Sequence, residues 1–244
     1  MNIITAGCSF TKYKWACWPN FVKWYEPGHN IINLGRSANS NETIARSVYN
    51  AVMKYKEIKK IYIMWSGADR YEIVVDKKPE KSSEDVTWSS YNPDFRWYQY
   101  HGGHVETEKH RYYQKHFLNE RQNQIRLLEK IVMTQMFLDK HKIEYKMMCF
   151  MGNILLHNED TMSNGQRALY KNIDWSNFIF YKDKLGLFEF ANQEYPNEYA
   201  EKSDNHPLPL THYKWVKDIM YKSKIETTDI ELKKLINFKK DRLK

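Results

Sequence analysis

Ser9 is the first residue of this sequence that could carry covalent chemistry. It lies in the segment GCSFT, residues 7–11, directly after the β-branched run of residues 2–6. Small turn residues after such a run indicate a strand that ends there, and open α/β sheets hold their ligands at the carboxyl ends of their strands. A serine hydroxyl becomes a nucleophile when a neighbouring base removes its proton. The position therefore predicts an exposed turn serine at the ligand-binding edge of a sheet.

The segment SDNHP, near the other end of the chain, could supply the base that Ser9 needs. A histidine oriented by a carboxylate is a common base for a serine nucleophile, and Asp204 and His206 are these two residue types. His212 is a second histidine in the same region and an alternative base. We prefer His206, because Pro207 has a fixed φ and stiffens the turn that presents it, whereas His212 begins an apolar-periodic segment.

Alternating strands and helices must bring these two ends of the chain together. Apolar runs indicate the strands, and apolar residues at helical spacing indicate the helices between them. Asn39 and Glu42 have the spacing of a capping box that opens one of these helices. The alternation predicts an α/β fold, a three-layer α/β/α sandwich around a mostly parallel sheet. We expect strands near residues 2–6, 30–34, 60–65 and 145–150, and helices near residues 18–26, 39–55, 112–140 and after residue 212.

Gly7, Gly35 and Gly67 each follow one of the first three predicted strands. The loops that follow parallel strands gather at one edge of the sheet. We therefore expect these three glycines to lie at the same edge as Ser9.

The order of these motifs resembles the SGNH/GDSL hydrolase superfamily, in the divergent form found in bacteriophages and environmental bacteria. Its first block is Gly-Asp-Ser after strand 1, and GCSFT has Cys8 in the place of the Asp. Its second block supplies a glycine after strand 2, here Gly35 in NLGRSANS. Its third block is Gly-x-Asn-Asp, where this chain has MWSGADRYE. Its last block is Asp-x-x-His, which DNHPLPLTHYKW matches with one residue fewer between Asp204 and His206.

The resemblance implies a flavodoxin-like SGNH hydrolase fold and ester hydrolysis without a cofactor. In such a site Ser9 attacks the acyl carbonyl, His206 takes its proton, and Asp204 orients His206. The backbone amides of Ser9 and Gly35 hold the oxyanion. The implied substrate is a small acyl ester or an O-acylated glycan, with deacylation of an O-acetylated carbohydrate as the preferred reaction.

The third block differs from the family at one position. The family has an Asn there that donates to the oxyanion, whereas an ionised Asp69 would repel the developing negative charge. Three alternatives remain: a protonated Asp69, a donor supplied by Arg70 or Arg36, or a register that brings Ser66 to the site. We expect Asp69 and Arg70 at the oxyanion or substrate-binding part of the site. A second hypothesis is a catalytically degenerate SGNH domain that serves as a binding or structural protein, for example in a virion.

Composition bounds the remaining classes of function. An apolar share of 42% is ordinary for a globular chain and argues against general disorder. No run approaches the ~18 apolar residues of a membrane span, so no membrane partner is expected. The formal net charge of +8 raises a third hypothesis, a polyanion-binding module. The lysines are scattered over the chain, so nucleic acid is not the expected partner.

We expect one domain over residues 1–244, with an insertion near 77–110 and a basic helical tail near 226–244. No Gly/Ser-rich or Pro-rich linker divides the chain. The N-terminus has no basic region before a long apolar one, so no signal peptide is expected. The three cysteines have no metal-ligand spacing and fit a reducing compartment. We therefore expect a cytoplasmic or virion-associated protein, and the sequence does not define its oligomeric state.

Three other patterns in the sequence could indicate different chemistry. Four histidines near the insertion could ligate a metal, but they show no compact spacing with a fourth donor, so no metal is expected. The aromatic run from Trp88 to Tyr100 could stack on sugar rings or form a small core of the insertion. No G-x-G-x-x-G follows the first strand, which argues against a dinucleotide. The four histidines near the insertion, mentioned above as possible metal ligands, are His101, His104, His110 and His116.

Overall fold

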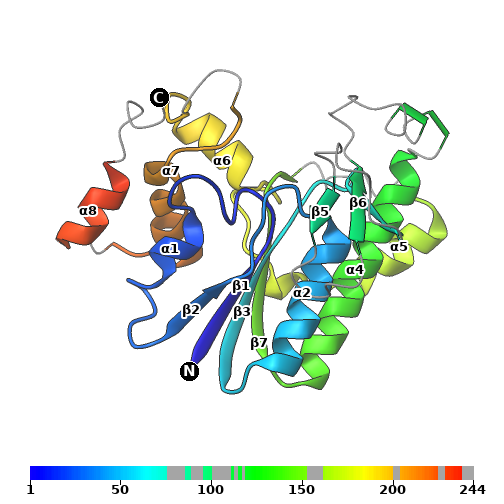
Figure 1. Ribbon diagram of the computed structural model, residues 1–244, viewed down its shortest axis with the longest axis horizontal. Helices are drawn as coiled ribbons and strands as arrows, with labels where there is room; N and C mark the ends of the chain where they lie inside the picture. The colour runs from blue at the N-terminus through cyan, green and yellow to red at the C-terminus, as the bar shows by residue number, and fades with distance from the viewer. Residues whose placement is uncertain are drawn as a thin grey trace.

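The structure is a computed structural model of the chain. Its main sheet contains four parallel strands in the order β2-β1-β3-β7 (Figure 1). These are β1 (Asn2–Ala6), β2 (Asn30–Asn33), β3 (Ile58–Trp65) and β7 (Glu144–Cys149). The structure describes residues 1–75, 86–88, 96–100, 111–112, 115–116, 119–152, 162–199, 204–224 and 229–237.

Strands β1 and β3 form the centre of this sheet and carry its most apolar sequence. Ile4 pairs with Ile32 of β2 on one side and with Ile61 of β3 on the other. The run from Ile61 to Trp65 is buried throughout. A strand covered on both faces shows such a continuous apolar run instead of alternation, which is why this segment could be recognised as a central strand.

Helices cover both faces of the sheet and produce three layers (Figure 1). One face carries α2 (Asn41–Lys54), α4 (Glu120–Lys140) and α5 (Asn164–Lys171). The other face carries α1 (Trp18–Val22), α6 (Leu187–Glu194), α7 (Pro209–Lys214), the π-helix η4 (Trp215–Met220) and α8 (Ile230–Ile236). A short 3-10 helix, η3 (Trp175–Asn177), lies beside β7.

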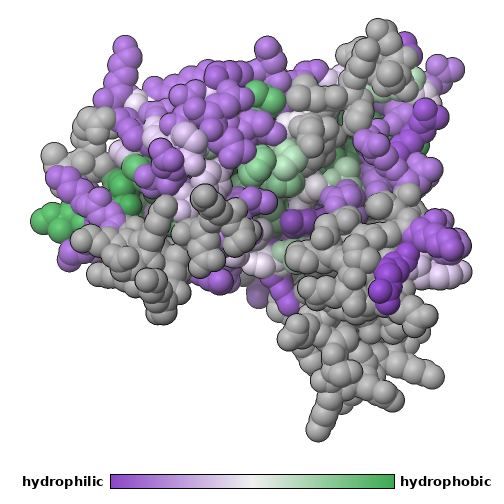
Figure 2. Space-filling view, turned by 90° about the horizontal axis from the view of Figure 1, so that it is seen from above, coloured by the Kyte–Doolittle hydropathy of each residue, from purple (hydrophilic) through white to green (hydrophobic). Residues whose placement is uncertain are grey.

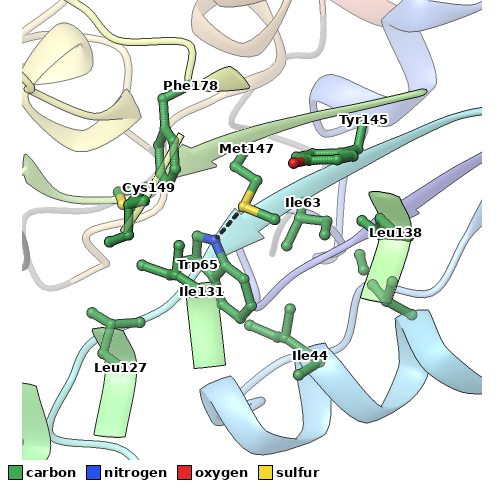
Figure 3. Packing of buried hydrophobic residues seen from close by; sticks show 14 of the residues in the cluster. Ile44, Ile63, Trp65, Leu127, Ile131, Leu138, Tyr145, Met147, Cys149 and Phe178 are labelled. Carbon is green, nitrogen blue, oxygen red and sulfur yellow. Dashed lines mark hydrogen bonds between the residues drawn. The ribbon is translucent and has the colours of Figure 1, made fainter. Parts of the chain in front are cut away.

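The core beneath α2 and α4 is drawn in Figure 3. Ile44 of α2 and Ile131 of α4 are fully buried against the sheet. Trp65, at the end of β3, lies among them and donates its indole N–H to the Met147 sulfur at 3.4 Å. Burial of a large apolar side chain is worth roughly 1.5–3 kcal/mol, so these contacts hold the end of β3, and the loop after it, in place.

The core on the opposite face holds the two ends of the chain together. Trp18 and Phe21 of α1 are fully buried in the same cluster as Trp215 of η4. Phe21 also packs edge-on against Tyr213 of α7, with ring centroids 5.9 Å apart. The helix after the nucleophile loop is therefore packed against the last helices of the chain, as the candidate site requires.

The predicted α/β fold is confirmed. All four predicted strands lie in one parallel sheet, and the loops after β1, β2 and β3 leave it at the same edge, at the top of Figure 1. Gly7, Gly35 and Gly67 all lie in these loops.

Two predicted helix starts differ from the structure. The helix near residue 39 is capped by Ser40, whose side chain accepts from the Thr43 amide at 3.2 Å, so Asn39 does not form the predicted capping box. The Asn39 side chain donates to the Gly7 carbonyl instead, because that buried acceptor, directly after β1, lies within its reach. The continuous helix α4 begins at Glu120 with Asn119 as its cap, later than predicted.

A second, antiparallel sheet of β4 (Tyr71–Val75), β6 (Arg96–Tyr100) and β5 (Val86–Trp88) follows β3. Most of the predicted insertion near 77–110 lies outside the described residues, as does the end of the basic tail. None of the helices in the described part of the chain combines the length and the apolar character of a membrane span.

Candidate active site

The loop after β1 presents Ser9 at the carboxyl edge of the sheet. The Cys8 carbonyl accepts from the amides of Thr11 at 2.9 Å and Lys12 at 3.2 Å, which closes a tight turn around Ser9. Cys8 is fully buried in the core on the α1 side. Ser9 is only 6% exposed, so the predicted exposed serine is wrong in this respect. The turn therefore holds Ser9 in a buried position, where its hydroxyl contacts His206.

Thr11 explains why glycine follows both β1 and β2. A Cβ on Gly7 would overlap the Thr11 hydroxyl, and a Cβ on Gly35 would overlap the Thr11 methyl group. Glycine permits this close approach because it has no side chain. The Thr11 hydroxyl also accepts from the Trp18 indole at 3.3 Å. The nucleophile loop is therefore packed directly against the loop after β2.

Asparagine side chains fasten the loops at this edge to one another. Asn39, in the loop after β2, donates to the Gly7 carbonyl at 3.0 Å. Asn41 accepts from the Ser66 amide at 2.8 Å and donates to the Gly67 carbonyl at 3.1 Å. Hydrogen bonds between buried groups are strong in a low-dielectric interior and favour one arrangement of the backbone. These bonds fix the loops after β1, β2 and β3 relative to one another.

Asp204 and His206 reach Ser9 from the segment that precedes α7. His206 Nε2 lies 2.7 Å from Ser9 Oγ, and His206 Nδ1 lies 2.6 Å from Asp204 Oδ1. Asp204 Oδ1 also accepts from the backbone amide of His206 at 3.0 Å. The structure thus brings together the three residues that the sequence singled out, in one hydrogen-bonded chain. Figure 2 looks down on this edge of the molecule and shows an apolar patch at its centre, flanked by hydrophilic residues.

The protonation states follow from the surroundings of the pair. Burial opposes ionisation of Asp204, but the bonds from His206 and Tyr13 hold the pKa of its carboxyl below the ordinary value. Burial lowers the pKa of His206, and the charges of Arg70 and Lys14 lower it further, against the raising effect of Asp204. Near neutral pH, His206 is therefore neutral and donates from Nδ1 to the Asp204 carboxylate. Its Nε2 is left to accept the Ser9 proton.

Tyr13 and Trp15 were not singled out in the sequence, yet both contact the histidine segment. Tyr13 donates its hydroxyl to Asp204 Oδ2 at 3.0 Å and stacks on the His206 ring. Trp15 donates its indole N–H to the Pro207 carbonyl at 2.8 Å. Aromatic residues four and six positions after Ser9 were a weak signal, because their partners lie almost 200 residues away in the chain.

His212 belongs to α7, and no hydrogen bond among the described residues joins it to Ser9, whose hydroxyl contacts His206 instead. It is 1% exposed, and burial lowers its pKa to about 3. Its Nδ1 has no hydrogen-bond partner within the described ranges. The geometry therefore favours His206 over His212 as the base.

Burial of neutral His212 predicts a loss of stability in mild acid. An unfolded histidine takes up a proton near pH 6.5, whereas folded His212 resists protonation down to about pH 3. The unfolded chain then binds the extra proton, so the free energy of unfolding falls by up to about 1.4 kcal/mol per pH unit below pH 6.5. Urea unfolding at pH 7.5 and 5.5 should show this loss in the wild type and a smaller loss in His212→Gln. Exposed His141→Gln is the control, and an equal loss in all three proteins would contradict the prediction.

The predicted role of the Gly35 amide as an oxyanion donor is not supported by the structure. That amide already donates to Asn33 Oδ1 at 2.8 Å, so it is not available to a substrate. Ala38, three residues later, has a φ of 63°, a conformation that is uncommon for residues other than glycine. Residues on either side of it bond to the nucleophile loop: the Arg36 amide and the Asn39 side chain both donate to the Gly7 carbonyl. Ala38 is therefore held close to the nucleophile loop.

Asp69 and Arg70 follow β3 at the same edge. The Asp69 carboxylate occupies the space that a side chain on Gly67 would need, so it folds back over its own loop. The Arg70 guanidinium donates to the Asn39 carbonyl at 3.2 Å and lies over the Phe150 ring. No carboxylate forms an ion pair with it among the residues that the structure describes.

The remaining candidates contribute less to this site. Ser66 is fully buried, so the register that would bring its hydroxyl to the substrate is not observed. His116 is exposed, and the other three histidines that were considered as metal ligands lie outside the described residues. Within the described part of the chain, no three His, Cys, Asp or Glu side chains are arranged to hold a metal ion.

The chain belongs to a family of unknown function, DUF6071, whose model matches residues 6–195. That range contains Ser9 and ends before Asp204 and His206. No curated protein sequence matches the chain. Among solved structures, it is similar to a proposed GDSL-like lipase from Parabacteroides merdae, with 11% sequence identity and a TM-score of 0.45, over 88% of this chain and 94% of that chain.

Proposed function

We propose that this protein is a serine esterase that works by acyl transfer. The observation that carries the proposal is the hydrogen-bonded chain from Ser9 Oγ through His206 to Asp204, with distances of 2.7 Å and 2.6 Å. A serine, a neutral histidine and an orienting carboxylate in this order are the groups that acyl transfer needs, and they are recognised by geometry and role.

In the proposed reaction, Ser9 Oγ attacks the ester carbonyl while its proton passes to His206 Nε2. Asp204 stabilises the imidazolium that forms and keeps its orientation. His206 then protonates the leaving alcohol, and the acyl group stays on Ser9. Water, deprotonated by His206, releases the acid and restores the serine. The lowered pKa of His206 keeps it in the basic form that the first step requires.

The oxyanion is proposed to be held by the amides of Ser9 and Ala38. Neither amide donates to another group among the described residues. Ser9 lies in the loop after β1 and Ala38 in the loop after β2, and hydrogen bonds to the Gly7 carbonyl connect these two loops. Preorganised backbone donors of this kind stabilise a developing negative charge. Arg70 adds a positive charge near His206 and takes the place of the neutral Asn donor that the resemblance implies. Asp69 takes no part, because its carboxylate lies over Gly67.

The substrate is proposed to be an O-acetylated carbohydrate. A small acyl group suits this site because Phe10 packs against His206 and Phe150 packs against Phe10, with ring centroids 5.2 Å and 5.1 Å apart. These rings limit the space beside the catalytic chain. The carbohydrate part rests on the motif resemblance. The side chains of the aromatic run from Trp88 to Tyr100, which could stack on sugar rings or form a small core of the insertion, lie outside the described part of the structure.

Release of acetate from O-acetylated glycans tests this substrate class. Wild type and Ser9→Ala are incubated with O-acetylated xylan and with O-acetylated peptidoglycan fragments, and free acetate is measured by NMR. We expect acetate from at least one glycan with the wild type and none above background with Ser9→Ala. If the wild type hydrolysed 4-nitrophenyl acetate but released no acetate from any glycan, the proposed carbohydrate substrate would be wrong, whereas the proposed esterase activity would stand.

A degenerate, binding-only domain is the second candidate function. Two observations favour it: the Gly35 amide is occupied by Asn33, and Asp69 stands where the family has a neutral donor. This candidate predicts an intact Ser9–His206 contact and no covalent reaction of Ser9 with an acyl donor.

A further inference from the structure

Tyr13 makes two contacts with the proposed catalytic chain, one with each partner of Ser9. Its hydroxyl donates to Asp204 Oδ2 at 3.0 Å. Its ring lies over the His206 ring with centroids 3.9 Å apart and planes only 10° from parallel. Burial and the bond to Asp204 raise the pKa of Tyr13 to about 12, so the hydroxyl is neutral and donates over the whole working range of an esterase.

Asp204 needs such a second partner because of its spacing. It stands only two positions before His206, and its Oδ1 atom accepts from both the backbone amide and the ring of that residue. The Oδ2 atom therefore turns away from His206, in a side chain that is only 18% exposed. An unpaired carboxylate oxygen in partly buried surroundings is costly. Tyr13 supplies the missing donor and fixes the rotation of the carboxylate.

The surroundings of Tyr13 hold its ring in place. Trp15 packs edge-on against Tyr13, with centroids 4.7 Å apart, and donates to the Pro207 carbonyl. Tyr13 and Trp15 thus hold the residues on both sides of His206 from the same loop that carries Ser9. These contacts link the loop that carries the nucleophile directly to the segment that carries its base.

We propose that Tyr13 is a positioning residue that holds the Asp204–His206 pair in the orientation that accepts the Ser9 proton. Its hydroxyl sets the carboxylate, and its ring sets the plane of the imidazole and excludes water from one of its faces. This inference rests on the proposed esterase function for its kinetic consequences. Its effect on His206 itself does not depend on that function.

The charged and titratable groups around His206 define the expected direction of the effect. They are Asp204 on its own segment, Tyr13 and Lys14 on the nucleophile loop, Arg70 after β3, and His212 on α7. Without the Tyr13 ring, water reaches the imidazole and the cost of charging it falls, so the pKa of His206 rises. Without the hydroxyl, more of the Asp204 charge acts on the imidazolium, which raises the same pKa by a smaller amount.

Two variants separate the hydroxyl from the ring. Tyr13→Phe keeps the stacked ring, and we expect kcat/KM for 4-nitrophenyl acetate to fall ~10-fold, as for the loss of one bond to a charged group. Tyr13→Leu removes both contacts and should cost ~100-fold, the effect of a misplaced catalytic group. The loss should lie in kcat with KM unchanged, since Tyr13 acts on the transition state through His206. Tyr25→Phe is the matched control, a half-buried tyrosine stacked on Tyr221.

The pH profile distinguishes positioning from a structural role. The basic form of His206 is needed, so the acid limb of kcat/KM follows its pKa. We expect this limb to move to higher pH in Tyr13→Leu, to move less in Tyr13→Phe, and to stay in Tyr25→Phe. A variant that is merely less folded loses amplitude with the limb in place. Equal limbs in Tyr13→Leu and wild type, after correction for the folded fraction, would overturn the proposal.

An NMR titration keeps this test independent of the proposed function. In protein labelled on histidine, the His206 resonance is identified by its absence from His206→Gln, and its pKa is followed in each variant. A rise of the His206 pKa in Tyr13→Leu but not in Tyr25→Phe supports the positioning role. This holds even if the protein hydrolyses no ester, because the lack of hydrolysis would contradict only the proposed esterase function. An unchanged His206 titration in Tyr13→Leu would refute the role of Tyr13, whatever the activity.

Discussion

Ser9→Ala is expected to lower the hydrolysis of 4-nitrophenyl acetate by at least ~10³-fold and to leave the fold intact. The alanine has no atom that can attack the carbonyl, so only unassisted hydrolysis in the site remains. The Ser9 hydroxyl contacts His206 and lies in a turn held by backbone bonds, so its removal should change stability little. Initial rates at saturating ester, together with thermal unfolding curves, measure both expectations.

Ser47→Ala is the matched control for this substitution. Ser47 is a buried serine of α2 whose hydroxyl donates to the Ile44 carbonyl at 2.7 Å, on the opposite face of the sheet from the core that holds Cys8. Its loss should leave the rate unchanged. Equal rates in Ser9→Ala and wild type would exclude Ser9 as the nucleophile.

The second large effect separates two histidines. His206→Ala should lower kcat by ~10³-fold or more, because the serine then has no base and the imidazolium cannot form. His212→Ala should keep much of the activity per folded molecule and lose stability, since it removes a fully buried ring from α7 and leaves a cavity. The measurement is kcat of each variant, divided by the fraction of folded protein that urea unfolding gives for that variant.

The reverse pattern would reassign the base. If His212→Ala abolished turnover while His206→Ala retained it, the contact between His206 and Ser9 would have no catalytic meaning. The role of Asp204 would then also fail, because its carboxylate is bonded to His206.

Much of the fold was predictable because local and global signals agree. The continuous apolar run of β3 is compatible with a strand buried on both faces, and the periodic apolar positions of α2 face the sheet. The starts of the helices were less predictable. Ser40 and Asn39 are both good capping residues, and only the Gly7 carbonyl, brought near by the sheet, decides that the Asn39 side chain bonds to the loop after β1.

The site was predictable in its residue types and only partly in its contacts. Ser9 and His206 could be found because strand ends and turn prolines mark where side chains are presented. Gly35 shows the limit of this reasoning: a glycine after a strand can serve as an amide donor or as a place of close approach. Here Thr11 fills the space beside it and Asn33 takes its amide.

Tyr13 could not have been assigned from the sequence, because nothing in the spacing of the nucleophile loop indicates a partner near residue 204. The same holds for Ala38, whose left-handed backbone has no sequence signature. Such residues are recognised only when the fold has placed two distant segments together.

Reaction with a serine-directed fluorophosphonate tests the central claim most directly. The probe reacts with an activated serine without depending on the identity of the acyl group or the alcohol. We predict that the wild type gains one probe molecule, located at Ser9 by peptide mass mapping, that His206→Ala reacts far more slowly, and that Ser9→Ala does not react. A wild type that remains unlabelled, or a label that persists at the same rate in Ser9→Ala, would contradict the assignment of Ser9 as the activated nucleophile.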